Sequence, residues 1–133
     1  MIRPDGMILC YPVITSGEYC HKGSFECLMG AEASKKDEKL RRLLSLEYQV
    51  GPQFPKTFLW HTWTDQSVPV ENILLLLQAL RKAGVNVEAH LYPVGPHGIA
   101  LGTEETQGID QKYLEPYCDS WMGLAIRWIE KQL

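Results

Sequence analysis

Residues 57–97 read TFLWHTWTDQSVPVENILLLLQALRKAGVNVEAHLYPVGPH, and this stretch decides the fold class. Two short apolar runs, at residues 57–61 and 87–92, flank a leucine-rich stretch from Val70 to Ala83. Such apolar runs are typical of strands buried on both faces of a sheet. The leucine-rich stretch has the pattern of a helix of about four turns, which Gly84 would stop. A strand, a helix and a second strand form a βαβ unit, which predicts two parallel strands.

The sequence on either side of this unit adds one strand and one helix. Residues 7–11 form another continuous apolar run, which Pro12 stops. Near the other end, Trp121, Leu124, Ala125 and Trp128 recur at helical spacing within a helix that we expect Asp119 to cap and that runs through residue 129. The predicted fold class is therefore α/β, with three parallel strands flanked by helices.

Residues 13–55 are the least regular part of the chain. A short helix is expected at residues 24–29, and the spacing of Leu40, Leu43, Leu44 and Tyr48 suggests a second helical stretch. A connection of this length exceeds what two neighbouring strands require, and long insertions often carry lids or binding loops. We therefore expect residues 13–55 to be a lid-like insertion.

Length and composition exclude several classes of protein. The chain has 133 residues, 45% of them hydrophobic and 22% charged, with a formal net charge of −3 at pH 7. These values indicate one soluble domain without the basic surface that nucleic-acid binding requires. No apolar run is long enough to span a membrane, and no signal peptide is recognisable, so a cytoplasmic location is expected if Met1 is the true start. The four cysteines form no C-x-x-C pair, so no metal and no cofactor are expected.

Two loops carry the residues that could take part in catalysis. Asp65 follows the strand expected at residues 57–61, and His97 follows the strand expected at residues 87–92, between Pro96 and Gly98. Ligands of open parallel sheets bind at the carboxyl ends of the strands, so the two side chains are expected to meet. A histidine accepts protons near neutral pH, and a carboxylate bonded to Nδ1 fixes its tautomer and stabilises the imidazolium. Asp65 and His97 are therefore the candidate catalytic residues.

Each of these two residues also has a simpler interpretation. An isolated aspartate in a strand-to-helix loop is usually a turn or cap residue, and an isolated histidine after a strand is usually structural. Their occurrence together, in the correct loops of consecutive strands, favours the catalytic interpretation. Ser67 lies close to Asp65, but a cap at the start of the following helix is its expected role.

The wider sequence resembles the α/β-hydrolase esterases, and among them the carbohydrate-active acetyl esterases and their xylanase-associated relatives. Residues 58–62 followed by Asp65 and residues 68–72 resemble the acid loop of that group. Residues 80–85 and 95–101 resemble its helix and histidine loop. The resemblance implies that residues 1–133 are a partial hydrolase domain holding the sixth, seventh and eighth strands of an eight-stranded sheet. It also implies that Asp65 is the acid and His97 the base of a catalytic triad.

The sequence departs from the esterase pattern in one large respect. The nucleophile motif G-x-S-x-G and the His-Gly-Gly oxyanion loop are absent from the chain. The first hypothesis is a serine ester hydrolase acting on small acyl esters or acetylated carbohydrates, with this chain inactive alone. A non-catalytic hydrolase-like protein that binds a partner or completes a split enzyme is the second, and a peptidase of the same fold is the third. We also expect a homodimer formed through the exposed first strand.

Overall fold

The computed structural model describes residues 3–133 as a three-stranded parallel sheet with helices on both faces. The strands are β1 (Gly6–Cys10), β2 (Lys56–Thr62) and β3 (Val87–Tyr92), and they are arranged in the order β1-β2-β3. Cys10 aligns with Trp60, and Trp60 aligns with His90. The α/β class and the three parallel strands are confirmed.

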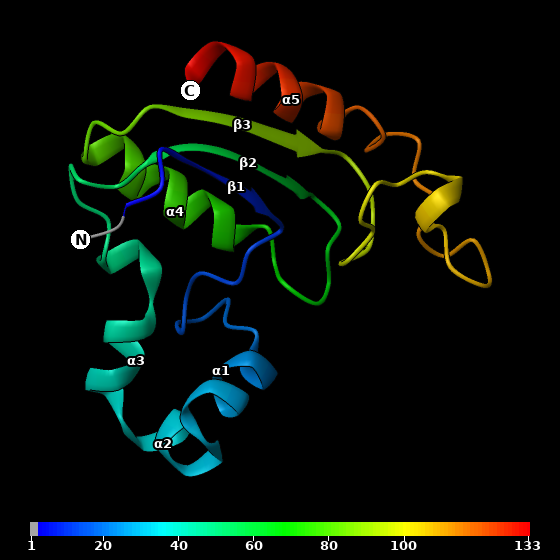
Figure 1. Ribbon diagram of the computed structural model, residues 1–133. Helices are drawn as coiled ribbons and strands as arrows, with labels where there is room; N and C mark the ends of the chain where they lie inside the picture. Colours follow the sequence, from blue (N-terminus) through cyan, green and yellow to red (C-terminus); the bar gives the residue numbers. More distant parts are fainter. Residues whose placement is uncertain (1–2) are drawn as a thin grey trace.

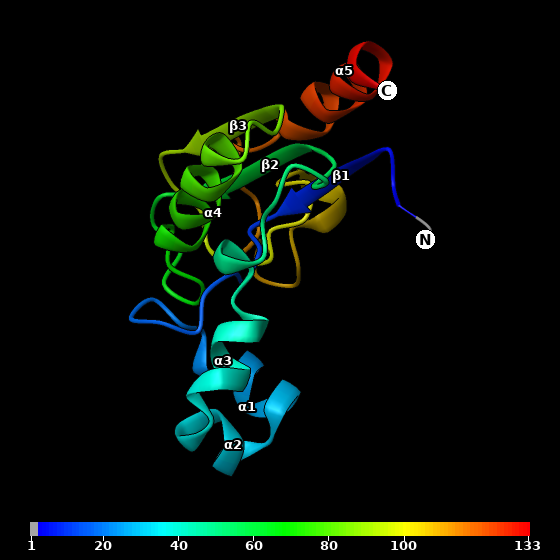
Figure 2. The same ribbon diagram turned by 90° about the vertical axis from the view of Figure 1, so that its left-hand side faces the viewer.

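The helices differ greatly in length and burial. The long helices are α4 (Glu71–Lys82), between β2 and β3, and α5 (Trp121–Gln132), after β3. Between β1 and β2 lie α1 (Lys22–Met29), α2 (Ala31–Lys36), α3 (Glu38–Leu44) and the 3₁₀ turn η1 (Leu46–Tyr48); a second 3₁₀ turn, η2, spans Glu104–Thr106. Figure 1 shows α4 and α5 on opposite faces of the sheet, and Figure 2 shows α1, α2 and α3 projecting away from it.

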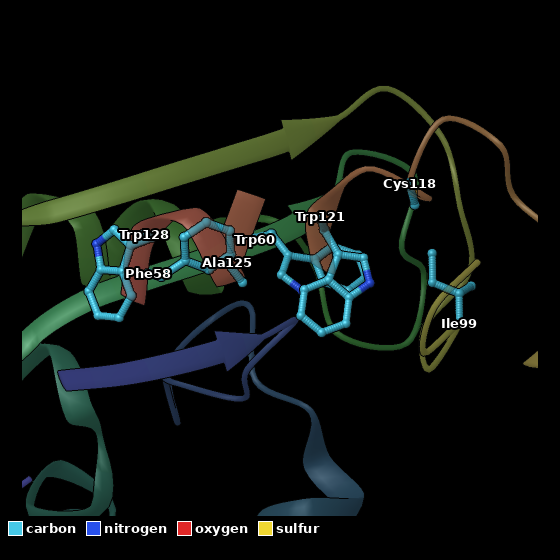
Figure 3. Packing of buried hydrophobic residues seen from close by; sticks show 7 residues of the cluster. All are labelled: Phe58, Trp60, Ile99, Cys118, Trp121, Ala125 and Trp128. Carbon is cyan, nitrogen blue, oxygen red and sulfur yellow. The ribbon is translucent and has the colours of Figure 1, made fainter. Parts of the chain in front are cut away.

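The central strand β2 carries the core because its side chains alternate between the two faces. Phe58 and Trp60 point toward α5 and pack with Trp121 and Trp128, as Figure 3 shows. Leu59 points to the other face and joins Ile14 and apolar side chains of α4 in a second cluster. Every residue of β2 after Lys56 is buried.

The outer strands are less buried than their apolar sequences suggest. Ile8 in β1 is 39% exposed and Leu91 in β3 is 41% exposed. The expectation of burial on both faces is therefore correct for β2 and wrong for β1 and β3, because only the central strand has a neighbour on each side and a long helix over each face.

Several local expectations also need correction. α5 begins at Trp121 with Ser120 at the cap position and no side-chain capping bond, so Asp119 does not cap it. Ser67 does not cap α4, which begins four residues later; its backbone N–H instead donates to Asp65 Oδ1. The helix α2 was not expected from the sequence, and α1 begins two residues before the expected start because the His21 side chain caps it.

Candidate active site

Asp65 lies just past the end of β2 with its carboxylate buried and fully hydrogen-bonded. Oδ1 accepts the backbone N–H groups of Ser67 and Val68, both at 2.9 Å. Oδ2 lies 2.8 Å from His97 Nδ1. The side chain of Asp65 has no exposed surface, whereas that of His97 is 33% exposed. The Asp65 carboxylate thus accepts two hydrogen bonds from its own loop and one from the histidine loop.

The bond between Asp65 and His97 fixes the state of the imidazole. A carboxylate only accepts hydrogen bonds, so His97 Nδ1 carries the proton and donates it. Nε2 is then the basic nitrogen of the ring. The structure therefore brings together the two predicted residues, from the loops after β2 and β3, in the geometry that general base catalysis uses.

The two loops are tied to each other beside this pair. Thr62 Oγ1 donates to the Gly95 carbonyl oxygen at 2.7 Å, and the Gly95 N–H donates to Thr64 Oγ1 at 3.0 Å. Gly95 has φ 142°, and a Cβ there would lie 2.8 Å from Thr62 Cγ2. A glycine is therefore required where the histidine loop crosses the acid loop.

Tyr11 packs against the His97 ring. It follows β1 with φ 38°, an uncommon value for a residue with a side chain. Its ring meets the His97 ring edge-on, with centroids 4.8 Å apart, and packs against Trp60 at 5.0 Å. Burial raises the pKa of Tyr11, so its hydroxyl stays protonated at neutral pH. Tyr11 thus limits the directions in which the imidazole can turn.

Sequence reasoning found Asp65 and His97 but missed Thr62, Thr64, Gly95 and Tyr11 as their supports. The turn residues Gly95 and Pro96 were a signal for a loop of fixed shape. Contacts between the two loops carry no local signal, because they join residues about thirty positions apart.

The remaining candidate groups do not add a nucleophile or a metal site. Within residues 3–133, none of the six serines forms a hydrogen bond with His97. The Ser24 hydroxyl lies 2.9 Å from His21 Nδ1, but this contact belongs to the start of α1. The described residues contain no cluster of three or more side chains suited to a metal ion. They also contain no helix long and apolar enough to cross a membrane.

A parallel sheet with an aspartate and a histidine joined at the carboxyl ends of consecutive strands defines the α/β-hydrolase class. Residues 18–123 match the family model of the prolyl oligopeptidase family, and the chain belongs to that family.

The relatives carry names of carbohydrate-active hydrolases and esterases. The chain is 44% identical over 103 residues to endo-1,4-beta-xylanase B of Butyrivibrio fibrisolvens, covering 77% of this chain and 16% of that protein. It is 35% identical over 105 residues to an acetylxylan esterase of Xylanibacter ruminicola, covering 77% and 22% respectively.

A solved structure with a similar fold supports the same family assignment. The acetyl ester-xyloside bifunctional hydrolase of Caldicellulosiruptor lactoaceticus matches with a TM-score of 0.83 and 41% identity, covering 96% of this chain and 42% of that one. The chain thus spans less than a quarter of the two curated relatives and less than half of the solved structure. The resemblance to α/β-hydrolase esterases, and to their C-terminal portion, is confirmed.

Proposed function

We propose that this chain supplies the acid and the base of a serine ester hydrolase that acts on small acyl esters, acetylated carbohydrates in particular. The observation that carries the proposal is the 2.8 Å bond between Asp65 Oδ2 and His97 Nδ1. The order of the two residues along the chain, acid before histidine, is the order of the α/β-hydrolase triad. The names of the relatives support an acetyl ester as the substrate.

In this mechanism each residue has one task. His97 Nε2 takes the proton of a serine hydroxyl as that oxygen attacks the ester carbonyl. Asp65 stabilises the imidazolium that forms and keeps the proton of Nδ1 in place. The imidazolium then returns a proton to the leaving alcohol, and the same base activates the water that hydrolyses the acyl-serine. The serine and the oxyanion donors belong to residues that this chain does not contain.

A chimera tests this assignment. Residues 3–133 replace the matching C-terminal portion of the Caldicellulosiruptor hydrolase, which keeps its own upstream residues. We expect the chimera to release acetate from acetylated xylan and p-nitrophenyl acetate. We expect His97→Ala in the chimera to lower kcat by roughly a thousandfold or more, because the triad members act as a unit. A folded chimera without turnover, or one indifferent to His97→Ala, would contradict the proposal.

Peptide hydrolysis is the second candidate, and the match to the prolyl oligopeptidase family favours it. Ester and peptide hydrolysis use the same acid and base. The same chimera distinguishes them when it is assayed on prolyl and other aminoacyl nitroanilides beside the acetyl esters. Faster turnover of the nitroanilides would make this a peptidase.

The chain alone is proposed to be inactive. Without a nucleophile and oxyanion donors, an acid–base pair provides only a small part of the rate enhancement. The purified chain is expected to resist labelling by a fluorophosphonate and to leave p-nitrophenyl acetate unhydrolysed above the His97→Ala background.

We also propose that the isolated chain forms a homodimer through β1. In the described residues β1 pairs with β2 on one side only, and α1, α2 and α3 project away from its other edge (Figure 1). An unpaired edge offers a row of backbone donors and acceptors to a second strand. Light scattering is expected to give twice the monomer mass of 15.2 kDa at micromolar concentration. A monomer mass would refute the dimer.

A further inference from the structure

His61 is a second histidine beside Asp65, and the mechanism above does not use it. It is the next-to-last residue of β2, and its side chain has no exposed surface. Its Nε2 lies 3.9 Å from Asp65 Oδ2, the same oxygen that His97 contacts. Nε2 is buried and has no hydrogen-bond partner. A buried polar atom without a partner is costly unless something nearby compensates for it.

The backbone of Thr62 and the Asp65 carboxylate together bear on which nitrogen of His61 carries the proton. Tyr11 N–H donates to the Trp60 carbonyl, which is the last ladder bond between β1 and β2. In a regular parallel ladder the next bond runs from the Thr62 N–H to the Tyr11 carbonyl. Tyr11 instead turns to φ 38°, and the Thr62 N–H donates to His61 Nδ1 at 2.9 Å. Nδ1 also lies 3.0 Å from the Thr62 carbonyl oxygen, so it accepts from the Thr62 N–H in one tautomer and donates to the Thr62 oxygen in the other.

The surroundings keep this ring neutral. Burial lowers the pKa of His61, and the charged or titratable groups that face it are Asp65, His97 and Glu71. The tautomer with its proton on Nδ1 would donate to the Thr62 carbonyl oxygen, but it would leave the Thr62 N–H without an acceptor and turn the lone pair of Nε2 toward the Asp65 carboxylate. The tautomer with its proton on Nε2 is therefore favoured.

We propose that His61 is a positioning residue, whose Nε2–H faces Asp65 Oδ2 so that this oxygen lies between two imidazole N–H groups. At 3.9 Å the contact is an oriented dipole rather than a full hydrogen bond. It offsets part of the carboxylate charge between two fully buried side chains, where such dipoles act strongly. His61 thereby moderates how strongly Asp65 accepts from His97, and it can donate to Oδ2 when the exposed His97 ring moves away. The inference rests on the proposed acid–base role of that pair.

Nuclear magnetic resonance of the complete chain tests the first part directly. The chain has four histidines, so each ring can be assigned from long-range ¹H–¹⁵N correlations. We expect His61 to show a protonated Nε2 and a bare Nδ1 across the neutral pH range. A protonated Nδ1 with a bare Nε2 would overturn the proposal without any substitution.

Two substitutions separate a positioning role from a structural one. His61→Asn places a carbonyl oxygen where Nδ1 accepts from Thr62, but it has no donor at the Nε2 position. His61→Gln places an amide N–H₂ at the Nε2 position, but it loses the acceptor for Thr62. Each of these two variants therefore removes one function of the His61 imidazole and keeps the other.

The expected readout is the resonance of the His97 Nδ1–H proton, which reports the strength of its bond to Asp65. In His61→Asn this proton should move downfield, because Oδ2 has lost its other donor and accepts more strongly. In His61→Gln it should return toward the wild-type position, although the protein is less stable. A signal unchanged in folded His61→Asn, or displaced equally in both variants, would leave His61 only a structural role.

These measurements are independent of catalysis. If the chimera described above hydrolyses nothing, the tautomer of His61 and the response of His97 are still defined by the chain itself. If the chimera is active and the His97 Nδ1–H resonance does not shift in the His61 variants, the proposed function stands and the positioning role fails.

Discussion

Two connections join neighbouring parallel strands in this molecule, and they are built in opposite ways. Residues 63–86 join β2 to β3 through the single helix α4, which buries four of its residues. Residues 11–55 join β1 to β2 through α1, α2, α3 and η1, which together bury only Phe25. Both connections satisfy the same topological requirement, but only the first packs a long helix closely on the sheet, and it also carries the loop with Asp65.

The difference shows which parts of the chain hold the site in place. Precise placement of Asp65 and His97 depends on the short connection, because its helix and both its strands share one core. The long connection is attached near its two ends, where Ile14, Val50 and Phe54 pack on the same core, and through Asn72. Asn72 Oδ1 accepts the N–H groups of Ile14 and Thr15 at 2.9 and 3.1 Å, and its Nδ2 donates to the Tyr19 carbonyl at 2.9 Å.

The largest effect is expected from truncating an apolar side chain in each connection. Leu76 in α4 is fully buried, whereas Leu43 in α3 is 60% exposed. Leu76→Ala should lower the free energy of unfolding by about 3 kcal/mol, because it removes buried surface and leaves a cavity. Leu43→Ala should change it by less than about 0.5 kcal/mol. Urea denaturation followed by tryptophan fluorescence measures both, and equal losses would show that the connections are equally packed.

A smaller effect is expected where the two connections are joined. Asn72→Ala leaves the buried N–H groups of Ile14 and Thr15 without an acceptor. The expected loss is about 2 kcal/mol of unfolding free energy. Ser34→Ala is the control, because its hydroxyl makes only an exposed bond to the Ala31 carbonyl. Hydrogen exchange should also quicken at residues 13–19 in Asn72→Ala while β2 and β3 remain protected; a uniform increase would mean that the connections do not open separately.

The sequence alone predicted the structure of the short connection, but it did not predict that of the long one. Apolar runs and the Gly84 stop predicted β2, α4 and β3 closely, and the positions of Asp65 and His97 followed from the ends of those strands. α2 was missed because its polar residues show no apolar face. Asn72 and His61 were not recognised as supports, since their roles depend on partners such as Ile14 and on the turn at Tyr11, which no local pattern encodes.

The smallest effect is a pH dependence that arises from His61 in β2, just before the short connection. Burial lowers the pKa of His61 below the usual histidine value of about 6.5, so the unfolded chain takes up a proton at this residue before the folded chain does. The free energy of unfolding should therefore fall as pH drops below 6.5, by at most about 1.4 kcal/mol per pH unit for one proton.

Because His61→Asn removes this ionisable group, the difference in stability between wild type and variant should shrink as the pH falls below 6.5. Thermal unfolding between pH 5 and pH 8 measures that difference. A constant difference across this range would mean that His61 ionises equally in the folded and unfolded states.

The Asp65–His97 bond joins residues 32 positions apart within one strand-helix-strand unit. The entropic cost of closing such a loop grows only with the logarithm of its length, and here no part of the loop passes through residues 11–55. Insertions and deletions in that long connection beyond Tyr11 therefore leave the spacing of Asp65 and His97 along the chain unchanged. The strand-helix-strand unit that holds Asp65 and His97 is thus local in sequence, and its geometry does not depend on the length of the long connection.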